Sequence, residues 1–192
     1  MPTAQIKKTI LIFSILFTLA IGVSYGYEDG FGPAKKVEGD HFTIYYSPEL
    51  ETAFLMQQLN LGPSDAFLTG ETVKGPDSPI ELTDMVDTLF ARVCDVLDME
   101  LYSYKGDIKV CKNFDQLKAI YKTLFDRELT KQSFYVNDLN TIYISEEFFK
   151  PEILGHEIAH AVISHYFVVL PSVKIQEVLA TYVEYQLRKS AK

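Results

Sequence analysis

The sequence predicts an α+β domain with a mixed or antiparallel sheet, and three observations support this fold class. Apolar and polar residues alternate at 41–46, as expected of a half-buried strand, and a second short strand is predicted at 107–111. Apolar residues recur three and four positions apart at 81–99 and 113–124, which is the pattern of amphipathic helices. Two further helical segments follow near the end of the sequence, so strands and helices are expected to combine in one domain.

Residues 1–26 are predicted to be a signal peptide or an N-terminal membrane anchor. Lys7 and Lys8 precede an uncharged, mostly apolar run at 9–27 that contains small residues near its end, which is the layout of a secretory signal. The apolar core at 10–23 is shorter than the roughly 20 residues that span a bilayer, whereas the whole uncharged run approaches that length. Both interpretations place the rest of the chain outside the cytoplasm, as a periplasmic or secreted domain. The anchor would add an association with the membrane.

After this segment the sequence predicts a linker at 27–39 and one domain at 40–192. The roughly 165 residues that follow the N-terminal segment are enough to form a hydrophobic core. A short helix is expected at 51–60. The Gly-Pro pairs in 61–79 predict a long surface loop after that helix.

The charge balance excludes one class of partner. The chain has a formal net charge of −8, and the only charged residues in its first 26 positions are Lys7 and Lys8, so the predicted domain is more acidic still. Binding of nucleic acid requires clustered lysine and arginine side chains, and the sequence has no such cluster. We therefore expect no nucleic-acid partner.

Cys94 and Cys111 are the two cysteines of the chain. In an oxidising compartment a disulfide between them is favoured, because secreted domains commonly retain such bonds. The alternative is two separate buried thiols, which pack as small apolar groups. Sequence spacing does not fix the geometry that a disulfide requires. The absence of a CxxC motif argues against a zinc site at either residue.

Residues 156–160 read His-Glu-Ile-Ala-His and are the most informative segment of the chain. A helical residue turns by about 100°, so His156 and His160 lie one turn apart and within about 40° of each other. Both imidazoles can therefore bind one tetrahedral zinc ion at about 2.0–2.1 Å. Glu157 is rotated to the flank, where it would act on a water bound to the metal. The sequence thus predicts one Zn²⁺ with Glu157 as the catalytic residue.

The third metal ligand is predicted on the next helix. Pro171 should end the first helix, and Ser172 is a suitable N-cap for a helix that begins at the following residue. A short connection implies an antiparallel pair, which puts Glu177 at about the depth of His160. Glu184 is the alternative ligand, because seven residues return to nearly the same helix face, but it lies about 10 Å farther along the axis.

A metzincin site is excluded by spacing. That pattern needs a glycine three residues and a histidine six residues after the second histidine of the motif. Ile163 and Tyr166 stand at those positions.

The segments HEIAH and QEVLATYVEYQL resemble the gluzincin branch of the zincin metallopeptidases. In that branch the second helix carries the ligand glutamate, an alanine three residues later and an aromatic residue nearby, and Glu177, Ala180 and Tyr182 match this arrangement. Residues 134–145 resemble the hairpin and edge strand that precede the active-site helix in small gluzincins of the peptidase MA-like kind. The sequence departs from the pattern at Val178, where a glycine would follow the ligand, and in having no tryptophan.

The resemblance implies a zincin-like fold and an extracytoplasmic zinc metallopeptidase. Its metal ligands would be His156, His160 and Glu177, and Glu157 would be the general base that activates water. A peptide or protein substrate is expected to add itself as an extra strand along the predicted edge strand Thr141–Ser145.

Two questions remain open at this stage. A zinc-stabilised binding or assembly module with little turnover is the alternative function, although a purely structural site needs no general base. The group that stabilises the oxyanion is not chosen by the sequence, and the nearby candidates are Tyr166, His165, Tyr182 and Tyr185.

Overall fold

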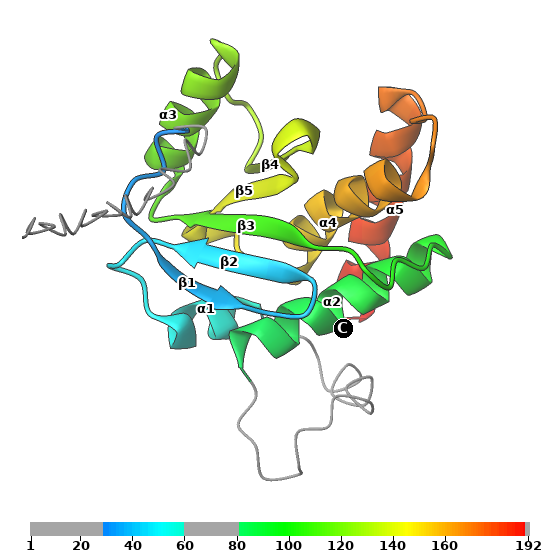
Figure 1. Ribbon diagram of the computed structural model, residues 1–192, viewed down its shortest axis with the longest axis horizontal. Coiled ribbons are helices and arrows are strands. Elements are labelled where there is room, and N and C mark those ends of the chain that lie inside the picture. The colour runs from blue at the N-terminus through cyan, green and yellow to red at the C-terminus, as the bar shows by residue number, and fades with distance from the viewer. Residues whose placement is uncertain (1–28, 60–80, 191–192) are drawn as a thin grey trace, which may run out of the picture.

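The computed structural model describes residues 29–59 and 81–190 and has a five-stranded sheet at its centre, with helices on both faces (Figure 1). The two outer strands run antiparallel to their neighbours, whereas the three inner strands are parallel. The sheet is therefore mixed, and the predicted α+β class is confirmed. In spatial order the strands are β1 (Lys35–Glu38), β2 (Phe42–Tyr46), β3 (Gly106–Cys111), β5 (Thr141–Ser145) and β4 (Ser133–Val136).

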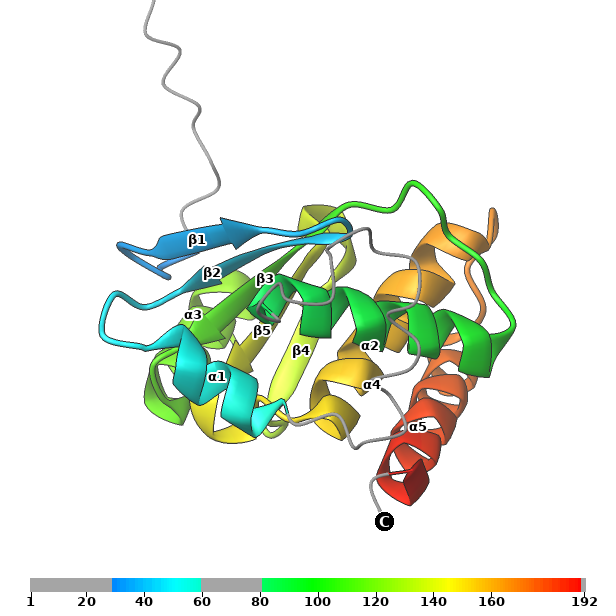
Figure 2. The same cartoon turned by 90° about the horizontal axis from the view of Figure 1, so that it is seen from below.

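Helices pack on both faces of the sheet and form two separate apolar cores (Figures 1 and 2). The larger core lies under four helices and contains Ile44, Ile108 and Ile142 from the inner strands. The smaller core lies under the remaining long helix and contains Tyr143. The four helices are α1 (Thr52–Gln58), α2 (Leu82–Leu97), α4 (Pro151–Tyr166) and α5 (Val173–Ser190), the opposite helix is α3 (Phe114–Phe125), and η2 (Asn137–Leu139) and η3 (Glu146–Phe148) are short 3-10 turns.

The linker predicted at 27–39 is wrong over its described part. Lys35–Glu38 pairs with β2 as strand β1, and the side chains of Asp29 and Phe31 are buried. The Asp29 carboxylate accepts a hydrogen bond from the Tyr143 hydroxyl at 2.6 Å and also contacts the ammonium group of Lys109. A buried carboxylate with these partners fixes the segment to the sheet, although its glycine-rich composition indicated flexibility.

The predicted disulfide is also wrong, because both cysteines are free. Cys94 belongs to the larger core and Cys111 to the smaller one, so the sheet lies between them. Burial raises the pKa of each thiol to about 12, and both are therefore protonated at neutral pH. They pack as small apolar side chains.

The helices predicted at 51–60, 81–99 and 113–124 are confirmed as α1, α2 and α3; α1 and α2 are slightly shorter than predicted, and α3 is shifted by one residue. The predictions for residues 1–26 and for the loop at 61–79 lie outside the described residues. Within the described part of the chain, no helix combines the length and the apolar character needed to span a bilayer.

Candidate metal centre

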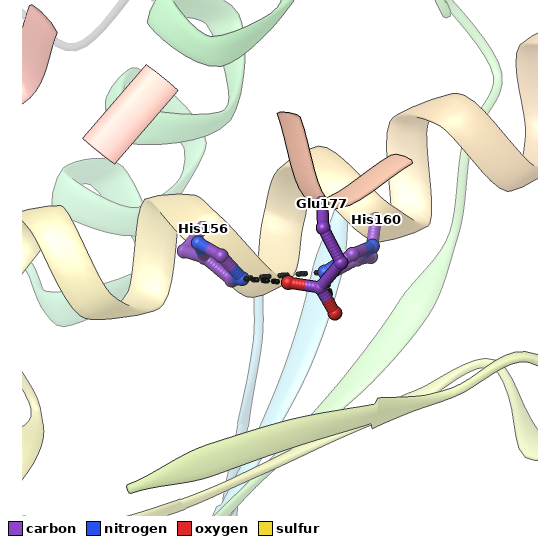
Figure 3. Close-up of side chains that lie close together, drawn as sticks. All are labelled: His156, His160 and Glu177. Atoms are coloured by element: carbon purple, nitrogen blue, oxygen red, sulfur yellow. Dashed lines mark hydrogen bonds and ion pairs between the residues drawn. The ribbon is translucent and has the colours of Figure 1, made fainter. Parts of the chain in front are cut away.

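Helix α4 carries the His-Glu-Ile-Ala-His segment through the middle of the fold. Pro151 occupies the first turn, where a missing N–H costs nothing, and Glu152 in the same turn favours the helix dipole. The apolar side chains that follow are buried against the sheet and neighbouring helices, which fixes the rotation of α4 about its axis. His156 and His160 consequently lie on the side of α4 that faces α5 (Figure 3).

Helix α5 packs closely against α4 because a glycine stands at the contact. A Cβ atom placed on Gly155 would lie 2.2 Å from Cδ1 of Leu187, so any larger residue would force the two helices to adjust. The predicted break is confirmed: α4 ends at Tyr166, and the carbonyl of Ser172 accepts the first backbone hydrogen bonds of α5. Gly155 directly precedes His156, so this close approach sets the distance between α5 and the first histidine.

The three predicted ligands meet at one point between these helices (Figure 3). The Nε2 atoms of His156 and His160 are 3.3 Å apart. Oε2 of Glu177 lies 3.6 Å from Nε2 of His156, and its Oε1 lies 3.8 Å from Nε2 of His160. Tetrahedral zinc with bonds of about 2.0–2.1 Å holds its ligand atoms roughly 3.3–3.4 Å apart. The two imidazole nitrogens already have this separation, and Glu177 presents an oxygen to each of them, so the three side chains are within reach of a single zinc ion.

Both histidines are held in the form that binds metal. Burial lowers the pKa of His156, and burial together with the neighbouring His156 lowers the pKa of His160 to about 4. The imidazoles are therefore neutral at neutral pH, and each keeps a lone pair for a metal. Their contacts with Glu177 join a neutral ring to a carboxylate and are not ion pairs.

Glu177 is ionised and has a basic neighbour that the sequence did not indicate. Lys131 donates a hydrogen bond from Nζ to Oε1 of Glu177 over 2.8 Å. Burial raises the pKa of Glu177, but the hydrogen bond and the positive charge of Lys131 outweigh this effect, so the net shift is downward. The carboxylate is thus available as an anionic ligand.

Glu157 is buried beside the three ligands, with 4% of its surface exposed. The hydroxyl of Ser133 donates a hydrogen bond to its Oε1 over 2.7 Å, and the backbone of Tyr135 also hydrogen-bonds to it. Burial raises the pKa of Glu157 to about 7, although these hydrogen bonds and Lys131 act in the opposite direction. A carboxyl group with a pKa near neutrality both accepts and returns a proton readily. Strand β4 therefore positions the predicted general base.

Glu184, the alternative ligand, lies behind His156. Its Oε2 is 3.3 Å from Nδ1 of that histidine, on the side of the ring opposite the metal position, so it is not a third ligand. Nδ1 of His156 is buried and makes no well-aligned hydrogen bond within the described residues. Arg188 holds the other oxygen of Glu184 at 2.5 Å. Carboxylates placed in this way orient metal-binding histidines and raise their basicity.

We expect Glu184→Gln to weaken zinc binding by about 10–100-fold, because the amide cannot support a basic imidazole as the carboxylate does. Competition titration with a zinc chelator measures this change. Glu152→Gln, in the first turn of α4, is the matched control and should bind zinc like the wild type. Equal affinity of Glu184→Gln and the wild type would show that Glu184 serves only its pairing with Arg188.

A cleft of about 320 Å³ opens beside the metal position. Strand β4 supplies one wall through Phe134 and Tyr135, and Leu170 and Val173 supply another. The polar side chains that also line the cleft are those of Lys131, Asn137, Ser164 and Gln176, in addition to Glu157, His160 and Glu177.

None of the four oxyanion candidates lines this cleft. His165 contacts the backbone carbonyl of Ala161 through Nδ1 and packs edge-on against Tyr104. Tyr182 and Tyr185 are exposed on the outer side of α5, and Tyr166 is exposed at the end of α4. Lys131, from the segment before β4, does line the cleft, and Ser133 of β4 contacts the cleft residue Glu157; neither belongs to a motif. Their positions follow from strand pairing, which the sequence pattern does not fix.

The prediction that β5 is the edge strand is wrong. Thr141–Ser145 pairs with β3 on one side and with β4 on the other, and all five residues are buried. The strand beside α4 at the margin of the sheet is β4, Ser133–Val136, and no other described strand pairs with its outer side. Both strands of the hairpin fit a half-buried pattern, and their order becomes clear only from the pairing with β3.

Comparison with protein-family models, with curated proteins and with solved structures finds no match to this chain. The likeness to gluzincins therefore rests on the motif, on the segment that contains Glu177 and on the spacing between them.

Proposed function

We propose that this chain is an extracytoplasmic zinc peptidase of the gluzincin kind, with one zinc ion held by His156, His160 and Glu177. The observation that carries the proposal is that the Nε2 atoms of His156 and His160 lie 3.3 Å apart and each lies 3.6–3.8 Å from an oxygen of Glu177, beside a buried glutamate. A structural zinc site gains nothing from a carboxyl group with a raised pKa at its edge.

The zinc ion would polarise the scissile carbonyl and lower the pKa of a water molecule towards about 7. Glu157 would take the proton of the attacking water and later deliver it to the leaving amine. The hydrogen bond from Ser133 to Oε1 of Glu157 would orient the carboxylate for this transfer. The carboxylate of Glu184, which lies 3.3 Å from Nδ1 of His156, would orient the imidazole for metal binding.

The proposed binding site for the substrate is the outer side of strand β4. Its outer side carries backbone groups that no described strand pairs with, and an extended peptide can occupy that side as a further strand. The adjacent walls contain Phe134, Leu170 and Val173, which suit an apolar substrate side chain. The docking strand expected at Thr141–Ser145 is thus replaced by β4, and a peptide substrate remains the best fit to the cleft.

A direct test combines metal analysis with cleavage of a peptide library. The purified chain should contain about one zinc per molecule, cleave library peptides, lose activity with a chelator and regain it when zinc is restored. Mass spectrometry of the products also distinguishes internal from terminal cleavage. Zinc binding without any cleavage would contradict the proposal and favour the zinc-stabilised binding module.

A further inference from the structure

Exposed apolar side chains gather on the α4–α5 hairpin. Nine of the twelve large apolar residues that are exposed in the described ranges lie between positions 166 and 185. One group is the connection between the helices, where Val168 is fully exposed, Val169 is 83% exposed and Leu170 also faces solvent. This connection, residues 167–172, is called the hairpin tip, and it lies at the margin of the molecule (Figure 1).

A second group forms a stripe along α5. Ile175, Val178, Tyr182 and Tyr185 follow one another at intervals of three and four residues and are between 48% and 61% exposed. At about 100° per residue these four side chains fall within roughly 80° of one another around the helix. Helix α5 buries Ala180, Val183 and Leu187 on its opposite side. It is thus apolar on two sides, and this outer stripe has no packing partner among the described residues.

The charges around the stripe distinguish between possible partners. Lys174 and Lys189 flank it, whereas Glu177 and Glu184, the two carboxylates of α5, lie about 120–140° around the helix from the middle of the stripe and point towards the histidines. The chain has no acidic residue between Glu157 and Glu177, although its net charge is −8. The outer side of α5 and the hairpin tip are therefore apolar and basic on an acidic protein.

We propose that the hairpin tip and the outer stripe of α5 dock on the surface of a lipid bilayer that contains anionic headgroups. An apolar helix face flanked by lysines is the arrangement that lies in the membrane interface. Tyrosines such as Tyr182 and Tyr185 place an apolar ring and a hydroxyl at the depth of the headgroups. Val168 and Val169 at the tip would enter the acyl region.

A second copy of the chain fits this surface less well. Pairing two outer stripes in parallel would oppose Lys174 to Lys174 and Lys189 to Lys189. Antiparallel pairing would bring Lys174 close to Arg188 and Lys189. No carboxylate of the stripe would offset these contacts in either orientation. Anionic lipid supplies the missing negative charge.

The absence of tryptophan from the chain allows a local test. Val169→Trp and Tyr182→Trp each place a single fluorescent reporter on the proposed surface. Tyr102→Trp places one at a residue that is 86% exposed outside the hairpin and serves as the matched control. Each full-length variant is mixed with vesicles of phosphatidylcholine and phosphatidylglycerol, with and without bromine-labelled acyl chains. Emission from the first two variants should shift to shorter wavelength and be quenched by the bromine, whereas emission from the control should do neither.

The local readout separates docking by the hairpin from attachment through residues 1–26, because a reporter held in water is not quenched even when the chain is bound to vesicles. Lys174→Glu combined with Lys189→Glu in the Val169→Trp background should reduce the quenching on these vesicles. The proposal is overturned if Val169→Trp and Tyr182→Trp remain unquenched. It is also overturned if their emission shifts without vesicles as the protein concentration rises, which would assign the surface to a second copy. Circular dichroism confirms that every variant is folded.

Discussion

Replacing Glu157 by glutamine is expected to lower kcat/KM for peptide hydrolysis by about 10²–10⁴-fold while zinc remains bound, because proton transfer by a positioned side chain contributes that much. Glutamine has nearly the size of glutamate, and its amide oxygen can still accept the hydrogen bond that Ser133 donates. It cannot take a proton from water. Initial rates on a library-selected peptide, measured with the zinc content of the same samples, check this result.

The control for this substitution is Glu152→Gln on the same helix, which removes a carboxylate in the first turn and should keep wild-type activity and zinc content. The raised pKa of Glu157 shows that its ionised form is disfavoured by burial, so a neutral amide at this position should not lower stability. A Glu157→Gln variant as active as the wild type would rule out Glu157 as the general base and, with it, the proposed mechanism.

The candidate metal centre could be anticipated because its geometry is largely local. His156 and His160 share a helix face through a spacing of four, and the break near Pro171 brings Glu177 back beside them. Glu184 was the alternative ligand because it lies seven residues after Glu177 on nearly the same helix face, and the choice between them depended on depth along the helix pair. The structure resolves it by placing Glu184 against Nδ1 of His156.

Features that depend on pairing between distant segments could not be anticipated in the same way. Lys131 and Ser133 reach the centre because β4 lies next to α4 at the margin of the sheet, and an alternating pattern does not specify which strand of a hairpin is the outer one. Residues 27–39 were predicted to be a linker because the signal for the four-residue strand Lys35–Glu38 is weak, and the contact of Asp29 with Tyr143 spans more than a hundred residues. Cys94 and Cys111 failed to pair because the sheet, which no local spacing reveals, lies between them.

Replacing the third proposed ligand, Glu177, by alanine should abolish most of the increase in the free energy of unfolding that zinc binding is expected to give. Free zinc at about 1,000 times its dissociation constant would stabilise the wild type by roughly 4 kcal/mol. For a chain of this size that corresponds to a rise in Tm of roughly 8–16 °C. Glu177→Ala leaves two neutral imidazoles without an anionic ligand, so we expect little or no rise at the same zinc concentration. Thermal unfolding with and without zinc measures the difference.

The metal-free stability of Glu177→Ala should stay close to that of the wild type, since Glu177 is partly exposed and its contact with Lys131 is a surface ion pair. A large loss without zinc would instead indicate a structural role for that contact. Glu152→Ala, which removes a carboxylate elsewhere on the hairpin, should retain the full response to zinc. An undiminished rise in Glu177→Ala would contradict the proposed ligand set. The two substitutions at the centre should then have separable effects, because Glu177→Ala is expected to remove both zinc binding and activity, whereas Glu157→Gln is expected to remove activity alone.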